Sequence, residues 1–204
     1  MQRTRLIGAA LACAVFAGPA TAAINLEFRP LDQTVFVGDT VRVELYAVSD
    51  TADSQSLSGI DAIFAWDPGF LTLLGLDETG SAAGSAASFP ADPFNLNESN
   101  PPADGDGIMV YFAPLGTPVM ASAAGTFITT FEFEALSPTP ATPVDLLLNG
   151  GSPEGMSRVL DGDTPGLDVL GTLSGATVEI IIPGPGAVAM LALAGLVGTR
   201  RRRR

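Results

Sequence analysis

The residues of this sequence that could do chemistry are acidic, and three of them suggest a calcium site. Asp161, Asp163 and Asp168 lie close together in a Gly-containing stretch, and Asp104 and Asp106 form a second such group. A hard cation such as Ca²⁺ binds several carboxylate oxygens on a flexible loop. Asp and Gly are also ordinary residues of tight turns. The sequence therefore leaves two interpretations open, a Ca²⁺ site at the first three residues and plain turn chemistry.

The sequence lacks the residues that most other kinds of enzyme catalysis require. The sequence contains no histidine and no lysine, and its only cysteine, Cys13, lies in the N-terminal leader. His-dependent triads, thiol nucleophiles, Schiff bases and His-ligated zinc are therefore excluded. Two carboxylates can hydrolyse a glycosidic bond, but with 22 acidic residues no single pair is informative. We predict that the protein is not an enzyme and that it has no cofactor other than the calcium considered above.

The tryptophan and the two tyrosines of the sequence are candidates for an aromatic surface on which a sugar ring could bind. Trp66, the only tryptophan, has the same parity as Ile60 and Phe64, which predicts a place in the core. Tyr46 falls on the polar side of its segment and is a candidate for an exposed platform, and Tyr111 is a weaker one. Scattered aromatics of this kind define no sugar site, so the ligand-binding residues stay open.

Charge is divided sharply between the ends and the middle of the chain. All 22 acidic residues lie between Glu27 and Glu179, where only Arg29, Arg42 and Arg158 are basic. The other arginines lie at the two ends. A strongly acidic body repels phosphate backbones and anionic lipid. We therefore expect no nucleic-acid partner for this protein.

Residues 1–22 have the pattern of a secretory signal peptide. Two arginines precede an apolar run, a Gly-Pro pair follows it, and small residues end at a cleavage point between Ala22 and Ala23. An alternative is a lipoprotein leader that uses Cys13. The apolar run is too short for a membrane-spanning helix.

The C-terminal stretch 183–204 combines a break, an apolar helix and a basic end. Pro183, Gly184 and Pro185 are followed by an apolar run of ~14 residues, which as a helix reaches only about 20 Å of the ~30 Å hydrocarbon core. The chain then ends with Arg200, Arg201, Arg202, Arg203 and Arg204. The arginines would stay in the cytoplasm. This pattern predicts a short hydrophobic helix that anchors the protein transiently, and a lasting one-pass anchor is the alternative.

Between the two ends, residues 23–182 have β patterning throughout. Short segments of alternating apolar and polar residues are separated by Gly and Pro turns, and no segment has a convincing helical period. Two long segments rich in small and polar residues, 77–107 and 149–166, are predicted loops. Eight or nine strands of this kind predict an all-β fold made of two packed sheets.

Three pieces of this body resemble cohesin-type domains. They are Val35–Val41 before an alternating strand, Leu57–Leu71 with its Trp-Asp-Pro turn, and Gly125–Phe133 with its Phe-rich strand. The resemblance implies a nine-stranded jelly-roll or Ig-like sandwich, which is shared with several carbohydrate-binding modules. It also implies a dockerin-type protein partner, although no dockerin-contacting residue can be matched.

The tail resembles the PEP-CTERM sorting signals of Gram-negative bacteria. Pro183, Pro185, the apolar helix and the arginine cluster match that pattern, and Gly184 stands where those signals have Glu. The resemblance implies a sorting protease of the exosortase type, removal of the tail and delivery to the cell surface or the extracellular matrix.

Together these features predict a secreted, non-enzymatic binding or adhesion module at the cell surface or in an exopolysaccharide matrix. Two alternatives are a polysaccharide-binding module and a cohesin-type protein-docking module of a polysaccharide-degrading system. A calcium-stabilised structural protein is a third.

Overall fold

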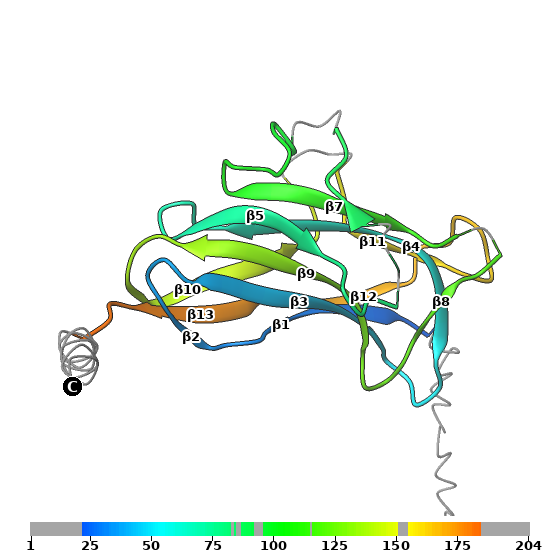
Figure 1. Ribbon diagram of the computed structural model, residues 1–204. Helices are drawn as coiled ribbons and strands as arrows, with labels where there is room; N and C mark the ends of the chain where they lie inside the picture. Colours follow the sequence, from blue (N-terminus) through cyan, green and yellow to red (C-terminus); the bar gives the residue numbers. More distant parts are fainter. Residues whose placement is uncertain are drawn as a thin grey trace, which may run out of the picture.

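The computed structural model describes residues 22–184, except 83, 85–86, 92–95, 115 and 151–154. This part of the chain folds into a sandwich of two β-sheets (Figure 1). Most of the predicted signal peptide and of the predicted tail lie outside the described residues. Among the residues that the structure describes, no helix is long and apolar enough to cross a membrane.

Thirteen strands form the two sheets in the described part of the chain. They are β1 (Ile24–Pro30), β2 (Thr34–Phe36), β3 (Thr40–Ser49), β4 (Gln55–Trp66), β5 (Leu71–Asp77), β6 (Ala87–Ser88), β7 (Asp106–Phe112), β8 (Val119–Ala121), β9 (Thr126–Ala135), β10 (Thr139–Leu147), β11 (Arg158–Asp161), β12 (Leu170–Ser174) and β13 (Ala176–Ile181). The predicted all-β class is confirmed. The prediction of nine strands missed β2, β6, β8 and β11, which have only two to four residues each.

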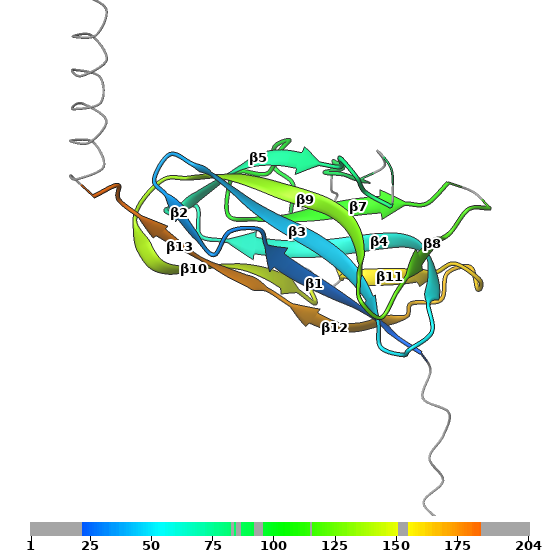
Figure 2. The same ribbon diagram turned by 60° about the horizontal axis from the view of Figure 1, so that its bottom comes forward.

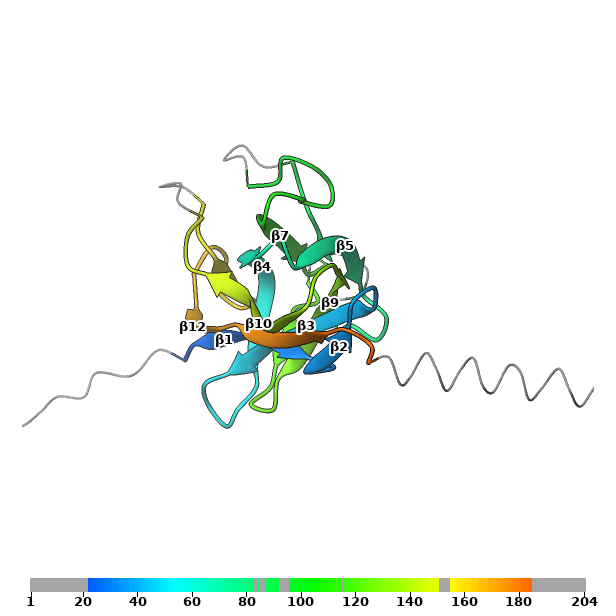
Figure 3. The ribbon, with the colours of Figure 1, turned by 90° about the vertical axis from the view of Figure 1, so that its left-hand side faces the viewer.

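The two sheets differ in size. One has five strands in the order β12-β1-β3-β9-β5, and the other has eight strands, six of them in the order β2-β13-β10-β4-β7-β6. The remaining two strands, β8 and β11, both pair with the first half of β4. β8 lies on the same edge of β4 as β7, and β11 lies on the same edge as β10. Figure 3 views this arrangement from the end at which β13 finishes. The long strand β4 therefore carries the centre of the larger sheet.

The core between the sheets is built on aromatic side chains that point inward from β1, β4 and β9. The ring of Phe64 lies 4.8 Å from that of Phe131 and 5.5 Å from that of Trp66, measured between centroids. Phe131 also meets the edge of Phe28 at 5.1 Å. Trp66 is 6% exposed, and its indole N–H donates to the carbonyl of Leu71 at 3.1 Å. The prediction that Trp66 belongs to the core is confirmed.

A β-bulge in β9 changes which of its side chains point into the core, so the alternation expected from the sequence is wrong for the first residues of this strand. Simple alternation places Phe127 on the same face as Phe131 and Phe133. The register with β3 slips between Leu45 and Tyr46, so Ile128 is buried and Phe127 lies beside Tyr46 instead. A bulge adds one residue to one strand and thereby reverses the facing of everything before it. The sequence carries no direct signal of that extra residue.

The second predicted loop, residues 149–166, contains a strand. Val159 is fully buried and pairs with Ile60 of β4, which makes this segment part of the larger sheet. The outer face of that sheet has a small core of its own, in which Ile63 and Ile108 are covered by Leu96 from the first long loop. The loops therefore cover part of the sheet.

Candidate functional site

A groove lies at one end of the sandwich, over β4, between the segment that joins β7 to β8 and the turn that follows β11. Its volume is about 530 Å³. It is lined by Ser58, Phe112, Ala113, Pro114, Gly116, Pro118, Asp161, Gly162 and Pro165. We call it the Phe112 groove. In Figure 2, β8 and β11 lie at one end of the sandwich and β13 finishes at the other. The groove therefore opens far from the point where the C-terminal tail begins.

Phe112 is the most exposed aromatic side chain in the groove. Tyr111 faces the core, so its neighbour Phe112 must face outward, and 58% of Phe112 is exposed. Its ring lies over Gly59 of β4, where an added Cβ would come within 3.0 Å of the ring. Because Gly59 has no side chain, the ring can pack directly against the backbone of β4. A large exposed apolar group held in one place is a typical binding feature.

Hydrogen bonds between β4 and the turn after β11 form the polar side of the groove. The hydroxyl of Ser58 donates to the carbonyl of Asp161 at 2.8 Å, and the hydroxyl of Ser56 donates to the carboxylate of Asp163 at 2.8 Å. Gly162 lies between them, and a Cβ there would be 2.7 Å from Cβ of Pro118. The Asp-Gly-Asp sequence is therefore required for close docking of this turn on β4 and on the loop before β8.

The three carboxylates of the predicted calcium site serve the turn itself. Asp161 accepts from the backbone N–H groups of Asp163 and Thr164 at 3.2 and 3.1 Å. Asp168 accepts from the N–H groups of Val159 and Leu170 at 3.2 and 3.0 Å. Within the part of the chain that the structure describes, no three acidic side chains come together as a metal site. These contacts favour turn chemistry, and calcium binding at Asp161, Asp163 and Asp168 stays a prediction.

The second acidic stretch lies near the far end of β4. Burial raises the pKa of Asp106 above its usual value, and the charges of Asp104 and Glu98 raise it further. Burial and these two negative charges make ionisation of Asp106 less favourable in the folded chain. Asp106 therefore keeps its proton to a higher pH than an ordinary aspartic acid does.

Both tyrosines are poor sugar platforms. Tyr46 faces outward as expected, but the guanidinium of Arg29 covers its ring at 4.2 Å from the centroid. Burial, followed by the hydrogen bond that its hydroxyl donates to Glu44 at 2.9 Å, raises the pKa of Tyr46. Tyr111 is fully buried. Phe112 is more exposed than any other aromatic residue in the described part of the chain. Sequence reasoning missed it, although its parity opposite to that of Tyr111 could have identified it.

An ion pair lies on the outer face of the larger sheet, one row from the groove. The guanidinium of Arg158 on β11 donates from Nε to the carboxylate of Asp61 on β4 at 3.1 Å. Asp61 is only 7% exposed, whereas half of the Arg158 side chain is exposed. The pair links the neighbouring strands β4 and β11.

The predicted processing sites fall at the edges of the described chain. Ala22 is exposed, and the backbone nitrogen of Ala23 donates to the carboxylate of Asp50 at 2.9 Å. Pro183 and Gly184 are exposed just after β13. The remaining tail residues, Pro185 and Arg200, Arg201, Arg202, Arg203 and Arg204, lie outside the described residues.

Comparison with known proteins rests on the fold. No family model matches the sequence, and no curated protein matches it. Among solved structures, the cohesin module of a family 33 glycoside hydrolase from Clostridium perfringens matches with a TM-score of 0.56 and 14% identity, over 80% of this chain and 100% of that one. The fold is that of a cohesin module.

Two further cohesin structures agree with this assignment. A chain of a type I cohesin–dockerin complex from Clostridium thermocellum has a TM-score of 0.53 and 15% identity, over 77% of this chain and 99% of its own. A non-cellulosomal cohesin from the archaeon Archaeoglobus fulgidus has a TM-score of 0.52 and 13% identity, over 84% and 98%. The cohesin-like sandwich predicted from the sequence is thereby confirmed.

Proposed function

We propose that this chain is a secreted, non-enzymatic binding module that docks a protein partner through the Phe112 groove. The observation that carries the proposal is the exposed ring of Phe112, fixed over Gly59 in a groove of a cohesin-type sandwich. One of the similar structures is a cohesin–dockerin complex, which supports a dockerin-type partner. Aromatic residues are enriched at the core of protein–protein interfaces.

Secretion and cleavage after Ala22 are parts of this proposal, and the contacts of Ala23 support them. The nitrogen of Ala23 lies 2.9 Å from the Asp50 carboxylate, and the carbonyl of Ala23 accepts from the amide of Gln55 at 3.1 Å. Cleavage at that bond turns the nitrogen into an ammonium group beside a carboxylate. The new N-terminus is thus received by a group of opposite charge, which favours the processed chain.

Delivery to the cell surface or the matrix of a Gram-negative bacterium is a further part of the proposal. The exposed Pro183 and Gly184 leave the sandwich at the end opposite to the Phe112 groove. An exosortase-type protease would have access to the tail there, while the groove stays free for a partner. The short apolar helix predicted from the sequence of the tail would make the membrane a transient partner.

Mass spectrometry of the protein from cells and from medium tests the sorting proposal. We expect an N-terminus at Ala23 in both fractions and loss of the arginine cluster from the released protein. Released protein that still carries Arg200–Arg204 would refute removal of the tail. The Phe112 groove is tested separately, because it does not depend on the tail.

Partner docking is tested by affinity capture from the source organism with matched variants. Phe112→Ala removes the exposed ring, and Leu74→Ala removes an exposed apolar side chain on β5 of the other sheet, which is 48% exposed. We expect Phe112→Ala to lose a dockerin-bearing protein that the wild type and Leu74→Ala both retain. Equal capture by all three proteins would show that the groove is not the docking site.

A polysaccharide ligand is the second candidate, favoured by the same ring. An exposed aromatic face next to the Ser58 hydroxyl and the Asp161 carboxylate provides the elements of a sugar platform. Affinity electrophoresis in gels that contain polysaccharide measures this directly. Retarded migration that Phe112→Ala abolishes would assign the groove to sugar, and unchanged migration in every gel would remove this candidate.

A further inference from the structure

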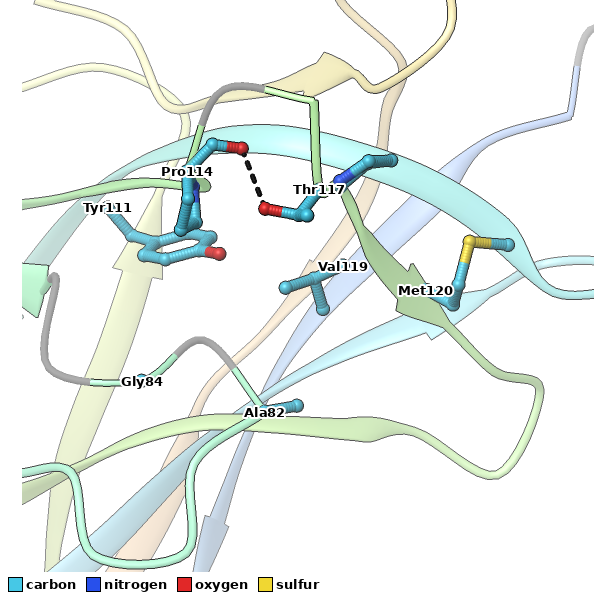
Figure 4. A pocket seen from close by; sticks show the side chains of 8 residues that line it. Ala82, Gly84, Tyr111, Pro114, Thr117, Val119 and Met120 are labelled. Carbon is cyan, nitrogen blue, oxygen red and sulfur yellow. Dashed lines mark hydrogen bonds between the residues drawn. The ribbon is translucent and has the colours of Figure 1, made fainter.

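A second hollow, separate from the Phe112 groove, lies on the other side of the loop between β7 and β8. Its volume is about 570 Å³. It is lined by Ala82, Gly84, Tyr111, Pro114, Thr117, Pro118, Val119 and Met120. Figure 4 shows the turn from Pro114 to Thr117 on one side and the segment with Ala82 and Gly84 on the other. Its size is in the range of pockets that hold small organic molecules, about 300–1,000 Å³.

The hydroxyl of Tyr111 points into this hollow without a partner. Tyr111 is fully buried, and its hydroxyl has no hydrogen bond, in contrast to nearly every other buried side-chain polar atom of the described residues. Figure 4 shows the hydroxyl turned toward the space beside Val119. An unpaired buried hydroxyl costs about 1–3 kcal/mol. An occupant that accepts a hydrogen bond from Tyr111 would recover this free energy.

The remaining lining decides the chemistry of that occupant. Pro114, Pro118, Val119 and Met120 contribute apolar walls, and none of the lining residues that the structure describes is charged. The second hydroxyl, on Thr117, donates to the carbonyl of Pro114 at 3.0 Å. A sugar carries several hydroxyls that each need a partner, and this lining supplies too few. A charged molecule would lose its hydration without an opposite charge.

Burial raises the pKa of Tyr111, and no neighbouring charge contributes to the shift. The hydroxyl therefore keeps its proton at neutral pH and is available as a donor. The partner atom must then be an acceptor. Ketone, ester and ether oxygens meet this requirement without adding a proton of their own.

We propose that the hollow beside Tyr111 is a binding site for a small uncharged organic molecule with an apolar body and a single oxygen acceptor. The apolar body packs between Pro118 and Val119, and the oxygen accepts the hydrogen bond of Tyr111. Met120, which is 50% exposed, lies at the rim, where its flexible side chain adapts to different bodies. This site goes beyond partner docking, and it does not use Phe112.

The test is a titration of the full chain with three probes, followed by NMR of the methyl groups of Val119 and Met120. Cyclohexanone has the proposed chemistry, cyclohexanecarboxylate adds a charge to the same ring, and methyl β-glucoside replaces the single acceptor by several hydroxyls. The chain has no lysine, so cyclohexanone cannot form a Schiff base with a side chain. We expect a saturable shift of both methyl groups with cyclohexanone and at least tenfold weaker binding of the other two.

Matched variants remove one hydroxyl each. Tyr111→Phe removes only the proposed donor, and Thr142→Val removes the other buried hydroxyl without a partner in the described chain, on β10. We expect cyclohexanone to bind Tyr111→Phe about fivefold more weakly, as loss of one hydrogen bond predicts, and to bind Thr142→Val unchanged.

Three results would overturn the proposal. The first is the absence of a saturable methyl shift with any probe, which would mean that the hollow holds only water. The second is equal binding of cyclohexanone by the wild type and by Tyr111→Phe. The third is tighter binding of the glucoside than of cyclohexanone. The wild-type shifts test the site even if a variant fails to fold. Partner capture by Phe112→Ala is measured independently, so failure of one proposal is distinguishable from failure of the other.

Discussion

Replacement of Asp168 by Ala and by Asn separates a turn-forming carboxylate from a metal ligand. One oxygen of Asp168 accepts hydrogen bonds from the N–H groups of Val159 and Leu170 at 3.2 and 3.0 Å. A hydrogen bond to a charged group contributes about 1.5–3 kcal/mol, but Asp168 is exposed, so water replaces part of each bond. We therefore expect Asp168→Ala to lower the free energy of unfolding by roughly 1–2 kcal/mol. Asp168→Asn keeps the acceptor oxygen and should lose less than half of that.

Thermal unfolding followed by circular dichroism, with calcium and with a chelator, measures both effects. For a domain of this size, 1–2 kcal/mol corresponds to a decrease in Tm of about 2–8 °C. We expect the same decrease for Asp168→Ala with and without calcium, and no effect of the chelator on the wild type. If Asp168→Asn were as damaging as Asp168→Ala, or if the chelator alone lowered Tm of the wild type, the charge would matter as a metal ligand does and the turn interpretation would be refuted.

Three further predictions concern stability. Because burial raises the pKa of Asp106, ionising it costs more in the folded than in the unfolded protein, so Asp106→Asn should increase stability at pH 7. The gain should shrink as the pH falls through the raised pKa of the folded state and should disappear below about pH 3, where the carboxyl is protonated in both states. A constant gain across urea titrations at several pH values would contradict this cause. Phe131→Ala should cost about 3–5 kcal/mol in urea unfolding, whereas the exposed Leu74→Ala should cost less than about 1 kcal/mol; similar losses would contradict the described core. Asp50→Ala should destabilise a chain that begins at Ala23 more than one that still carries the leader, and more at low than at high salt; equal losses would mean that no ammonium pair forms.

The all-β fold could be predicted from the sequence because the apolar residues of its long strands recur at every second position. In β4, the residues Ile60, Phe64 and Trp66 share one parity and all three are buried as predicted, whereas Ile63 on the opposite face is buried under Leu96. The short strands gave no such signal, since two to four residues are too few to show a period. The bulge at Ile128 was likewise invisible, because an extra residue changes facing without changing composition.

The candidate site was less accessible, because it depends on contacts between distant segments. The Asp-Gly-Asp sequence at residues 161–163 predicts either a turn or a metal site, and the backbone N–H groups that Asp161 accepts from become known only from the structure. Phe112 is different, since its outward facing follows from Tyr111 next to it. What the sequence could not show is that Gly59 lies under the ring and that two prolines from the following loop form the walls.

Amide hydrogen exchange of the captured complex is the most direct test of the Phe112 groove as the docking site. The account predicts that partner binding slows exchange in the segments around Phe112 and around Asp161, while the edge strand β5 with Leu74 exchanges as in the free protein. Slowed exchange confined to β5 and the five-stranded sheet, with the groove unchanged, would contradict it.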